Sequence, residues 1–255
     1  MLLILFTAQV TAQSTVDAST ADTNTNTAVK SSAKSNAKIL GELDEKKERN
    51  VKHFLMEDGT YEADVYPMAV HYLDNGKWKD IDNTLAAGTD EDNNDVLVNK
   101  NNDFKAKFAK NSKANKLVRI QKDKYELSWN LEGAEKSDAQ NVPADQSALN
   151  NLSEDDKKRA ATKATSVINF PNIQSNLDLT YKLNGDAVKE YFILKDKIDS
   201  PQFKLELNLK NLVPQIQKNN SIIFYDEQDG NKAVFSMKAP VMYDSLHEDS
   251  NNIKL

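Results

Sequence analysis

A histidine and two aspartates close to a predicted hairpin turn are the residues best placed to do chemistry. His71 precedes the Asp-Asn-Gly turn at residues 74–76, and Asp80 and Asp82 follow it. Imidazole and carboxylate groups together can bind a metal ion or relay protons. A hairpin turn here places His71 roughly opposite Asp80, which supplies at most two ligands. A polar pair across two strands is therefore favoured over a metal site.

A second candidate is an acidic loop that carries Asp90, Asp92 and Asn94 at alternate positions, as a calcium loop does. Asp95 stands where the sharp-turn glycine belongs, and Asn101 stands where the bidentate glutamate belongs. A solvated acidic loop is the favoured interpretation, with calcium binding at millimolar affinity left open.

Aromatic residues offer a third chemistry, because sugars stack on exposed rings. The aromatic residues that can form such a platform are Tyr61, Tyr66, Tyr72, Trp78, Tyr125 and Trp129. Their period-two spacing makes most of them core candidates. Trp78, with Tyr72 and His71, is kept as the candidate ligand-binding group.

Motifs of catalysis are missing from the sequence. It contains no Gly-x-Ser-x-Gly, no phosphate-cradling glycine loop and no His-Glu-x-x-His. Two paired acids can hydrolyse a glycosidic bond, but the many acids of this chain give no way to select two. We therefore predict no enzyme activity, no catalytic residue, no metal and no cofactor.

Composition disfavours other classes of function. The net charge is −6 and the basic residues are spread along the chain, which disfavours nucleic acid as a partner. The chain has no cysteine, which excludes a disulfide framework, a thiol nucleophile and a cysteine-based zinc cluster. Hydrophobic residues make up 39% of the chain, enough for a packed core once the polar amino-terminal segment is set aside.

The first residues predict export. Residues 1–12 begin with a short apolar run and end with small residues at Val10 and Ala12, the positions that a signal peptidase reads. We predict cleavage after Ala12, although no basic residue precedes the run and the true start can lie upstream. The run is about half of the roughly 20 residues that span a bilayer, so no membrane span is predicted. Residues 13–38, which are small and polar, predict a disordered linker.

The elements that must position these residues begin with a predicted amphipathic helix at residues 39–57. Its apolar residues are separated by a run of charges, and Glu45 with Arg49 and Glu48 with Lys52 are spaced to pair along a helix. A helix docked on the following domain is favoured over a coiled-coil partner helix, because the apolar spacing does not hold over heptads.

Beyond Gly59 the apolar period changes toward two, which predicts strands. Many short runs separated by turn signals favour an antiparallel sheet structure over a parallel α/β fold. The predicted fold class is mainly β: antiparallel β-sandwich-like domains preceded by an amphipathic helix and a disordered leader. A first β subdomain is expected at residues 58–131, a polar insertion with a short helix at 132–164, and a second β subdomain, cut short at its carboxy end, at 165–255.

Several short motifs of this chain occur together in one known family. They are Val70-His71-Tyr72, the turn at 74–76, Trp78, Ile81 to Leu85, Phe104 to Phe108, Tyr125 to Trp129, Phe170 to Asn172, Leu177 to Tyr181, Val188 to Glu190 and Ala239 to Asp244. As a set they resemble the amino-terminal region of large secreted Rhs/YD-repeat wall-associated proteins of Gram-positive bacteria. The resemblance covers about residues 40–255.

This resemblance implies a secreted, wall-associated front module that presents a much larger downstream region. The partners it implies are a downstream YD-repeat region of the same protein and cell-wall polysaccharide. Any toxic activity in that family belongs to a carboxy-terminal region beyond this sequence. Two alternatives stay open from the residues alone: a carbohydrate-binding sandwich that recognises wall glycan, and a glycoside hydrolase with unrecognised paired acids.

Overall fold

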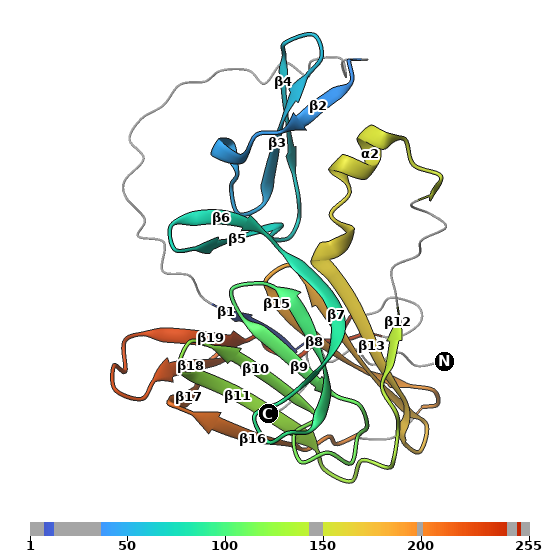
Figure 1. Cartoon of the computed structure of the whole chain (residues 1–255). Helices are drawn as coiled ribbons and strands as arrows, with labels where there is room; N and C mark the ends of the chain where they lie inside the picture. Colours follow the sequence, from blue (N-terminus) through green and yellow to red (C-terminus); the bar gives the residue numbers. More distant parts are fainter. Residues whose placement is uncertain (1–7, 13–36, 143–149, 198–200, 244–248, 251–255) are drawn as a thin grey trace.

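The protein is built mainly from antiparallel strands, as the sequence predicts (Figure 1). The computed structural model describes residues 8–12, 37–142, 150–197, 201–243 and 249–250. Among these residues, two large sheets form one body, and a small sheet with a hairpin forms a second part that stands above it in Figure 1.

The first large sheet has eight strands in the order β12-β13-β14-β15-β1-β19-β18-β17. Its strands are β12 (Gln140–Val142), β13 (Thr165–Gln174), β14 (Leu177–Asn184), β15 (Ala187–Leu194), β1 (Ala8–Ala12), β19 (Ala233–Met237), β18 (Ile222–Asp226) and β17 (Leu212–Ile216). In β14 every second residue is buried, from Leu177 to Leu183. This alternation is what a strand with one face on a core requires.

The second large sheet has six strands in the order β16-β11-β10-β9-β8-β7. Its strands are β16 (Leu205–Lys210), β11 (Tyr125–Leu131), β10 (Val118–Lys122), β9 (Lys105–Ala109), β8 (Asp95–Asn101) and β7 (Asp82–Thr89). Trp129 from β11 and Tyr181 from β14 are among the largest fully buried side chains, and their rings lie 6.2 Å apart. The two sheets therefore share one hydrophobic core, as the layers of a sandwich do.

The second of the two β regions expected from sequence contributes strands to both layers. Strand β16 lies within residues 165–255, yet it pairs with β11 in the sheet that is otherwise made from residues 82–131. A single core cluster joins residues from both regions.

The prediction of an amphipathic helix at residues 39–57 is wrong. This segment forms strand β2 (Ile39–Glu42), a single 3₁₀ turn η1 (Asp44–Lys46) and strand β3 (Val51–Met56). Strand β3 then pairs with β4 (Tyr61–Val65) across the Asp58-Gly59 turn. Phe54 and Met56, two residues apart, are both buried on one face of β3. The burial of these alternate residues favours a strand, and it determines the structure more strongly than the helix-like spacing of the charged residues does.

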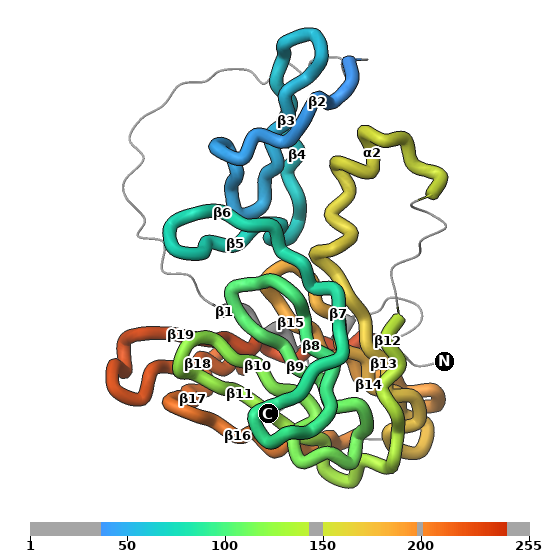
Figure 2. Tube along the Cα trace, viewed as in Figure 1, coloured from blue at the N-terminus to red at the C-terminus, as the bar shows by residue number. Residues whose placement is uncertain are grey.

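The expected short helix is present in the polar insertion. Helix α2 spans Glu154–Arg159, and the Ser153 hydroxyl accepts a hydrogen bond from the Asp156 N–H at its amino end. Helix α2 lies beside the three-stranded sheet β2-β3-β4 (Figure 2). The Ile39 N–H donates to the Asp155 carboxylate at 3.0 Å, so the helix is attached to β2.

Strand β1 occupies an interior position of the eight-stranded sheet. Val10 pairs with Val188 of β15 on one side and with Met237 of β19 on the other. The rest of the predicted leader, residues 1–7, and nearly all of the predicted linker lie outside the described residues. Cleavage after Ala12 and a strand at Ala8–Ala12 exclude one another in the same mature molecule, so the signal peptide stays a prediction.

A buried asparagine cluster joins β7 and β8 to the β14–β15 turn and to the segment just before β13. The Asn83 side-chain amide donates to the carbonyls of Ala164 and Gly185, each at 2.8 Å. Asn99 and Asn102 both donate to the side-chain oxygen of Asn83. Because all these donors and acceptors are buried, the position of the β14–β15 turn relative to β7 is fixed by hydrogen bonds.

Candidate functional site

The Asp-Asn-Gly turn at residues 74–76 forms the predicted hairpin. It joins β5 (His71–Asp74) to β6 (Lys77–Asp80), and His71 is the direct cross-strand partner of Asp80. Asn75 and Gly76 both have positive φ, the conformation that a two-residue hairpin turn demands. The predicted pairing of His71 with Asp80 is confirmed.

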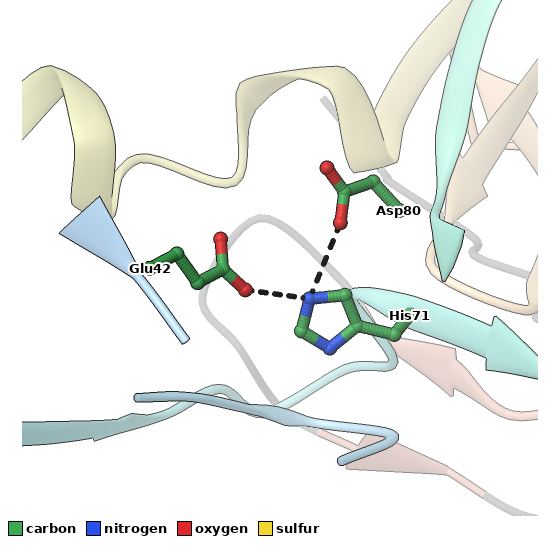
Figure 3. A group of neighbouring side chains, drawn as sticks. All are labelled: Glu42, His71 and Asp80. Atoms are coloured by element: carbon green, nitrogen blue, oxygen red, sulfur yellow. Dashed lines mark hydrogen bonds and ion pairs between the residues drawn. The ribbon is translucent and has the colours of Figure 1, made fainter. Parts of the chain in front are cut away.

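The structure adds a second acidic group that the sequence analysis did not bring to this site. Glu42, at the end of β2, places its Oε1 3.0 Å from His71 Nε2, and Asp80 Oδ1 lies 3.4 Å from the same nitrogen (Figure 3). The three donor atoms all lie within 4.8 Å of one another. One imidazole nitrogen therefore faces two carboxylates from two separate sheets.

Backbone geometry fixes the orientation of the imidazole ring. His71 Nδ1 lies 2.6 Å from the carbonyl oxygen of Glu48, and a carbonyl can only accept. Nδ1 therefore carries a hydrogen, which leaves Nε2 as the atom directed at Glu42 and Asp80. The His71 side chain is 0% exposed, whereas that of Asp80 is 62% exposed, so the cluster is closed on the imidazole side and open on the aspartate side.

Two lysines border the cluster. Lys47 Nζ lies 2.7 Å from Asp80 Oδ1 and 3.0 Å from Asp44 Oδ1, and Lys52 Nζ lies 3.7 Å from Glu42 Oε2. Burial opposes ionisation of both Lys47 and Asp80. Burial is the largest single influence, but the hydrogen bond between the two side chains and the attraction of neighbouring opposite charges together outweigh it, so the pKa of Lys47 is raised and the pKa of Asp80 is lowered.

The other two candidate ligand-binding residues lie on different faces of the hairpin. Trp78 pairs with Leu73, which puts it on the same face as His71, whereas Tyr72 belongs to the opposite face. Trp78 is half-buried beside Leu73, whose residue surface is 54% exposed. Tyr72 packs against a small apolar cluster around Ile81.

The wider set of six aromatic residues does not form one platform. Trp129 and Tyr125 are buried, as their spacing predicts. Tyr61 is exposed beneath the Lys46 ammonium, which lies 4.4 Å from the ring centroid, and the Tyr66 hydroxyl donates to the Arg159 carbonyl. These contacts leave Trp78 as the member of the set that has a largely exposed apolar neighbour on a hairpin.

The acidic loop between β7 and β8 closes on a buried arginine. Arg119 on β10 forms ion pairs with Asp90, Glu91 and Asp92, and its side chain is only 3% exposed. Asp90 Oδ1 also accepts the N–H groups of Asp92 and Asn94. The loop is thus only partly solvated, and an internal cation already takes the carboxylates that the calcium interpretation required.

One carboxyl group has a strongly perturbed environment inside the core. Burial raises the pKa of Glu190 to about 7, although hydrogen bonds from Tyr181 and Trp129 act in the opposite direction. Glu190 is 1% exposed, so it lies within the sandwich rather than at a surface where a polysaccharide can reach it. Its arrangement is that of a buried polar cluster between the sheets.

Comparison with known proteins gives one informative similarity. The chain is 24% identical over 216 residues to a wall-associated protein of Geobacillus stearothermophilus, and the match covers 84% of this chain and 79% of that protein. No family model matches the chain, and no solved structure matches it. Among the described residues, no helix has the length and apolarity needed to cross a bilayer.

Proposed function

We propose that this chain is a non-catalytic module of a secreted, cell-wall-associated protein of the Rhs/YD-repeat type. Its role would be to associate with the wall and to present the region that follows it. The observation that supports this proposal is the similarity to a wall-associated protein along 84% of the chain. A rigid two-layer body with a shared core is a suitable scaffold for such a role.

Cell fractionation tests the wall association. The chain, expressed with its own amino terminus in a Gram-positive host, is expected in the wall fraction and to stay there after mild washing. Recovery in the cytoplasm or free in the medium would contradict the proposal. The Rhs/YD-repeat part is tested separately by reading the gene beyond residue 255 for YD repeats.

Glycan binding is a second candidate, favoured by the half-buried Trp78 beside exposed Leu73 on the β5–β6 hairpin. Aromatic rings of this kind stack on sugars. Sedimentation of the purified chain with wall polysaccharide tests it. Retention that is lost in Trp78→Ala but kept in Lys77→Ala, an exposed neighbour on the same strand, supports binding. No retention of the parent chain at all leaves a role in presentation alone, and retention that Trp78→Ala does not reduce argues against Trp78 as the binding residue.

A further inference from the structure

We propose that Glu42, His71 and Asp80 form a binding site for one divalent transition-metal ion, with Zn²⁺ as the best-suited ion. The inference goes beyond wall association, because it concerns a ligand of the upper part of the molecule (Figure 3). It rests on the geometry of three side chains that come from different strands.

The donor spacing suits a first-row metal ion. Zn²⁺ binds nitrogen and oxygen ligands at about 2.0–2.2 Å, so its ligand atoms lie about 3.0–3.5 Å from each other. Nε2 of His71 lies 3.0 Å from Glu42 Oε1 and 3.4 Å from Asp80 Oδ1. The two carboxylate oxygens lie within 4.8 Å of each other, so an ion held by all three atoms requires the exposed Asp80 side chain to adjust its position.

The imidazole is held in the tautomer that a metal ion needs. Its Nδ1–H donates to the Glu48 carbonyl, which is the usual outer contact of a metal-bound histidine. Nε2, at the far side of the ring, can then offer its lone pair toward the two carboxylates.

The bordering lysines can be accommodated. Lys47 shares Asp80 Oδ1 with the proposed ion, but it also contacts Asp44 at 3.0 Å and keeps that partner when the ion binds. Lys52 reaches the other oxygen of Glu42, Oε2, at 3.7 Å. The chemistry of the ligands selects the ion, because an imidazole with two carboxylates suits Zn²⁺ better than Ca²⁺, which prefers oxygen ligands alone.

Titration calorimetry of the metal-free full chain with Zn²⁺ tests the site. We expect one ion per chain, and an affinity at least about tenfold weaker in Asp80→Asn. Asp80 is largely exposed, so this variant should fold. His53→Gln is the matched control, because His53 also contacts a carboxylate, that of Glu48 at 3.0 Å, but has a single acidic partner in the described part of the chain. Ca²⁺ should give no comparable binding.

A second variant should change the Zn²⁺ affinity in the opposite direction. Lys47→Met removes the cation that competes for Asp80 and keeps the apolar stem, so it should tighten Zn²⁺ binding by about tenfold. Absence of Zn²⁺ binding up to millimolar concentration would overturn the proposal. So would an affinity that Asp80→Asn leaves unchanged, or one that Lys47→Met weakens.

Discussion

At the scale of single residues, the buried carboxyl group of Glu190 carries the clearest consequence for stability. Its pKa of about 7 in the folded protein is above its ordinary value of 4.5. The folded state therefore holds this proton more tightly than the unfolded state does. The stabilisation is complete below about pH 4.5 and is lost as the pH rises through 7.

Glu190→Gln should remove this dependence. The amide oxygen can still accept from Trp129, which donates to the same oxygen at 3.0 Å, and no charge is buried at high pH. Relative to the parent protein, the variant should gain on the order of 3 kcal/mol of unfolding free energy between about pH 4.5 and pH 8. Urea denaturation at several pH values measures this gain. A constant difference across the range would contradict the assignment.

Of the three residues in the proposed metal site, sequence patterns could bring together two but not the third. The Asn75-Gly76 turn fixes the hairpin register, so the pairing of His71 with Asp80 could be predicted. Glu42 could not be added, because the segment that carries it was predicted to be helical. Its approach to His71 depends on the docking of one sheet on a hairpin, for which no short-range signal exists.

At the scale of elements, the β14–β15 turn of the sandwich lies close to Ala69, in the segment between β4 and β5. Gly185 has a φ of +61°, and a Cβ atom there would lie 2.6 Å from the Ala69 carbonyl oxygen and 2.9 Å from the Ala69 nitrogen. Both are backbone atoms, which cannot turn away as a side chain can. Glycine is thus required at position 185 for two reasons: the positive φ disfavours other residues, and the Ala69 backbone leaves no room for a Cβ atom.

Gly185→Ala should therefore destabilise the protein by about 2–4 kcal/mol, more than a positive φ alone explains. Gly76→Ala is the matched control, because Gly76 has a φ of +76° and no atom within 4 Å of the added Cβ. Thermal unfolding of both variants measures the difference. Equal losses in the two variants would show that the contact with Ala69 contributes nothing.

The interior position of β1 leads to another prediction. Removal of residues 1–12 would leave the facing edges of β15 and β19 unpaired, and unpaired edges promote aggregation. Removal of residues 1–7 alone leaves β1 intact. We expect a lower unfolding temperature and increased light scattering for the longer truncation only. Identical behaviour of the two truncations would contradict a structural role for β1.

The strand elements were largely predictable because turn signals and period-two spacing agree with each other. Leu205, Leu207 and Leu209 alternate with polar residues, and they form β16. The segment from residue 39 to residue 57 was predicted as a helix because pairs such as Glu45 with Arg49 are spaced as on a helix. Strand β3 gains hydrogen bonds from β2 and β4 on both sides, and this tertiary pairing decides its conformation.

At the scale of the whole molecule, Arg159 at the end of α2 connects the polar insertion to the small sheet. Its guanidinium pairs with Glu62 and Asp64 on β4 and lies 5.2 Å from the centroid of the Phe54 ring. The Arg159 carbonyl also accepts from Tyr66. One residue thus joins segments that are about 100 positions apart in the chain.

Arg159→Ala should loosen the small sheet without unfolding the sandwich. Two partly exposed ion pairs and one cation–π contact together contribute about 1–2 kcal/mol, which corresponds to about tenfold faster amide exchange in β2, β3 and β4. Hydrogen–deuterium exchange by mass spectrometry measures this. Lys157→Ala, on the same helix but paired only with Glu154 among its described ion pairs, serves as the control. Equal exchange in the two variants would count against the connection.

The place of β1 also sets the order in which the molecule can be completed. Val10 belongs to the part of the chain that is synthesised first, yet its partners Val188 and Met237 belong to parts that emerge much later. The eight-stranded sheet cannot be completed while the chain is still emerging from a ribosome or a translocation channel. Strands β15 and β19, which pair with β1 on its two sides, have not yet been synthesised or exported at that point. Closing so long a loop slows folding, and until then the early strand must be kept from pairing with other chains. A protein with this topology depends on the last third of its sequence to supply both strands that pair with β1.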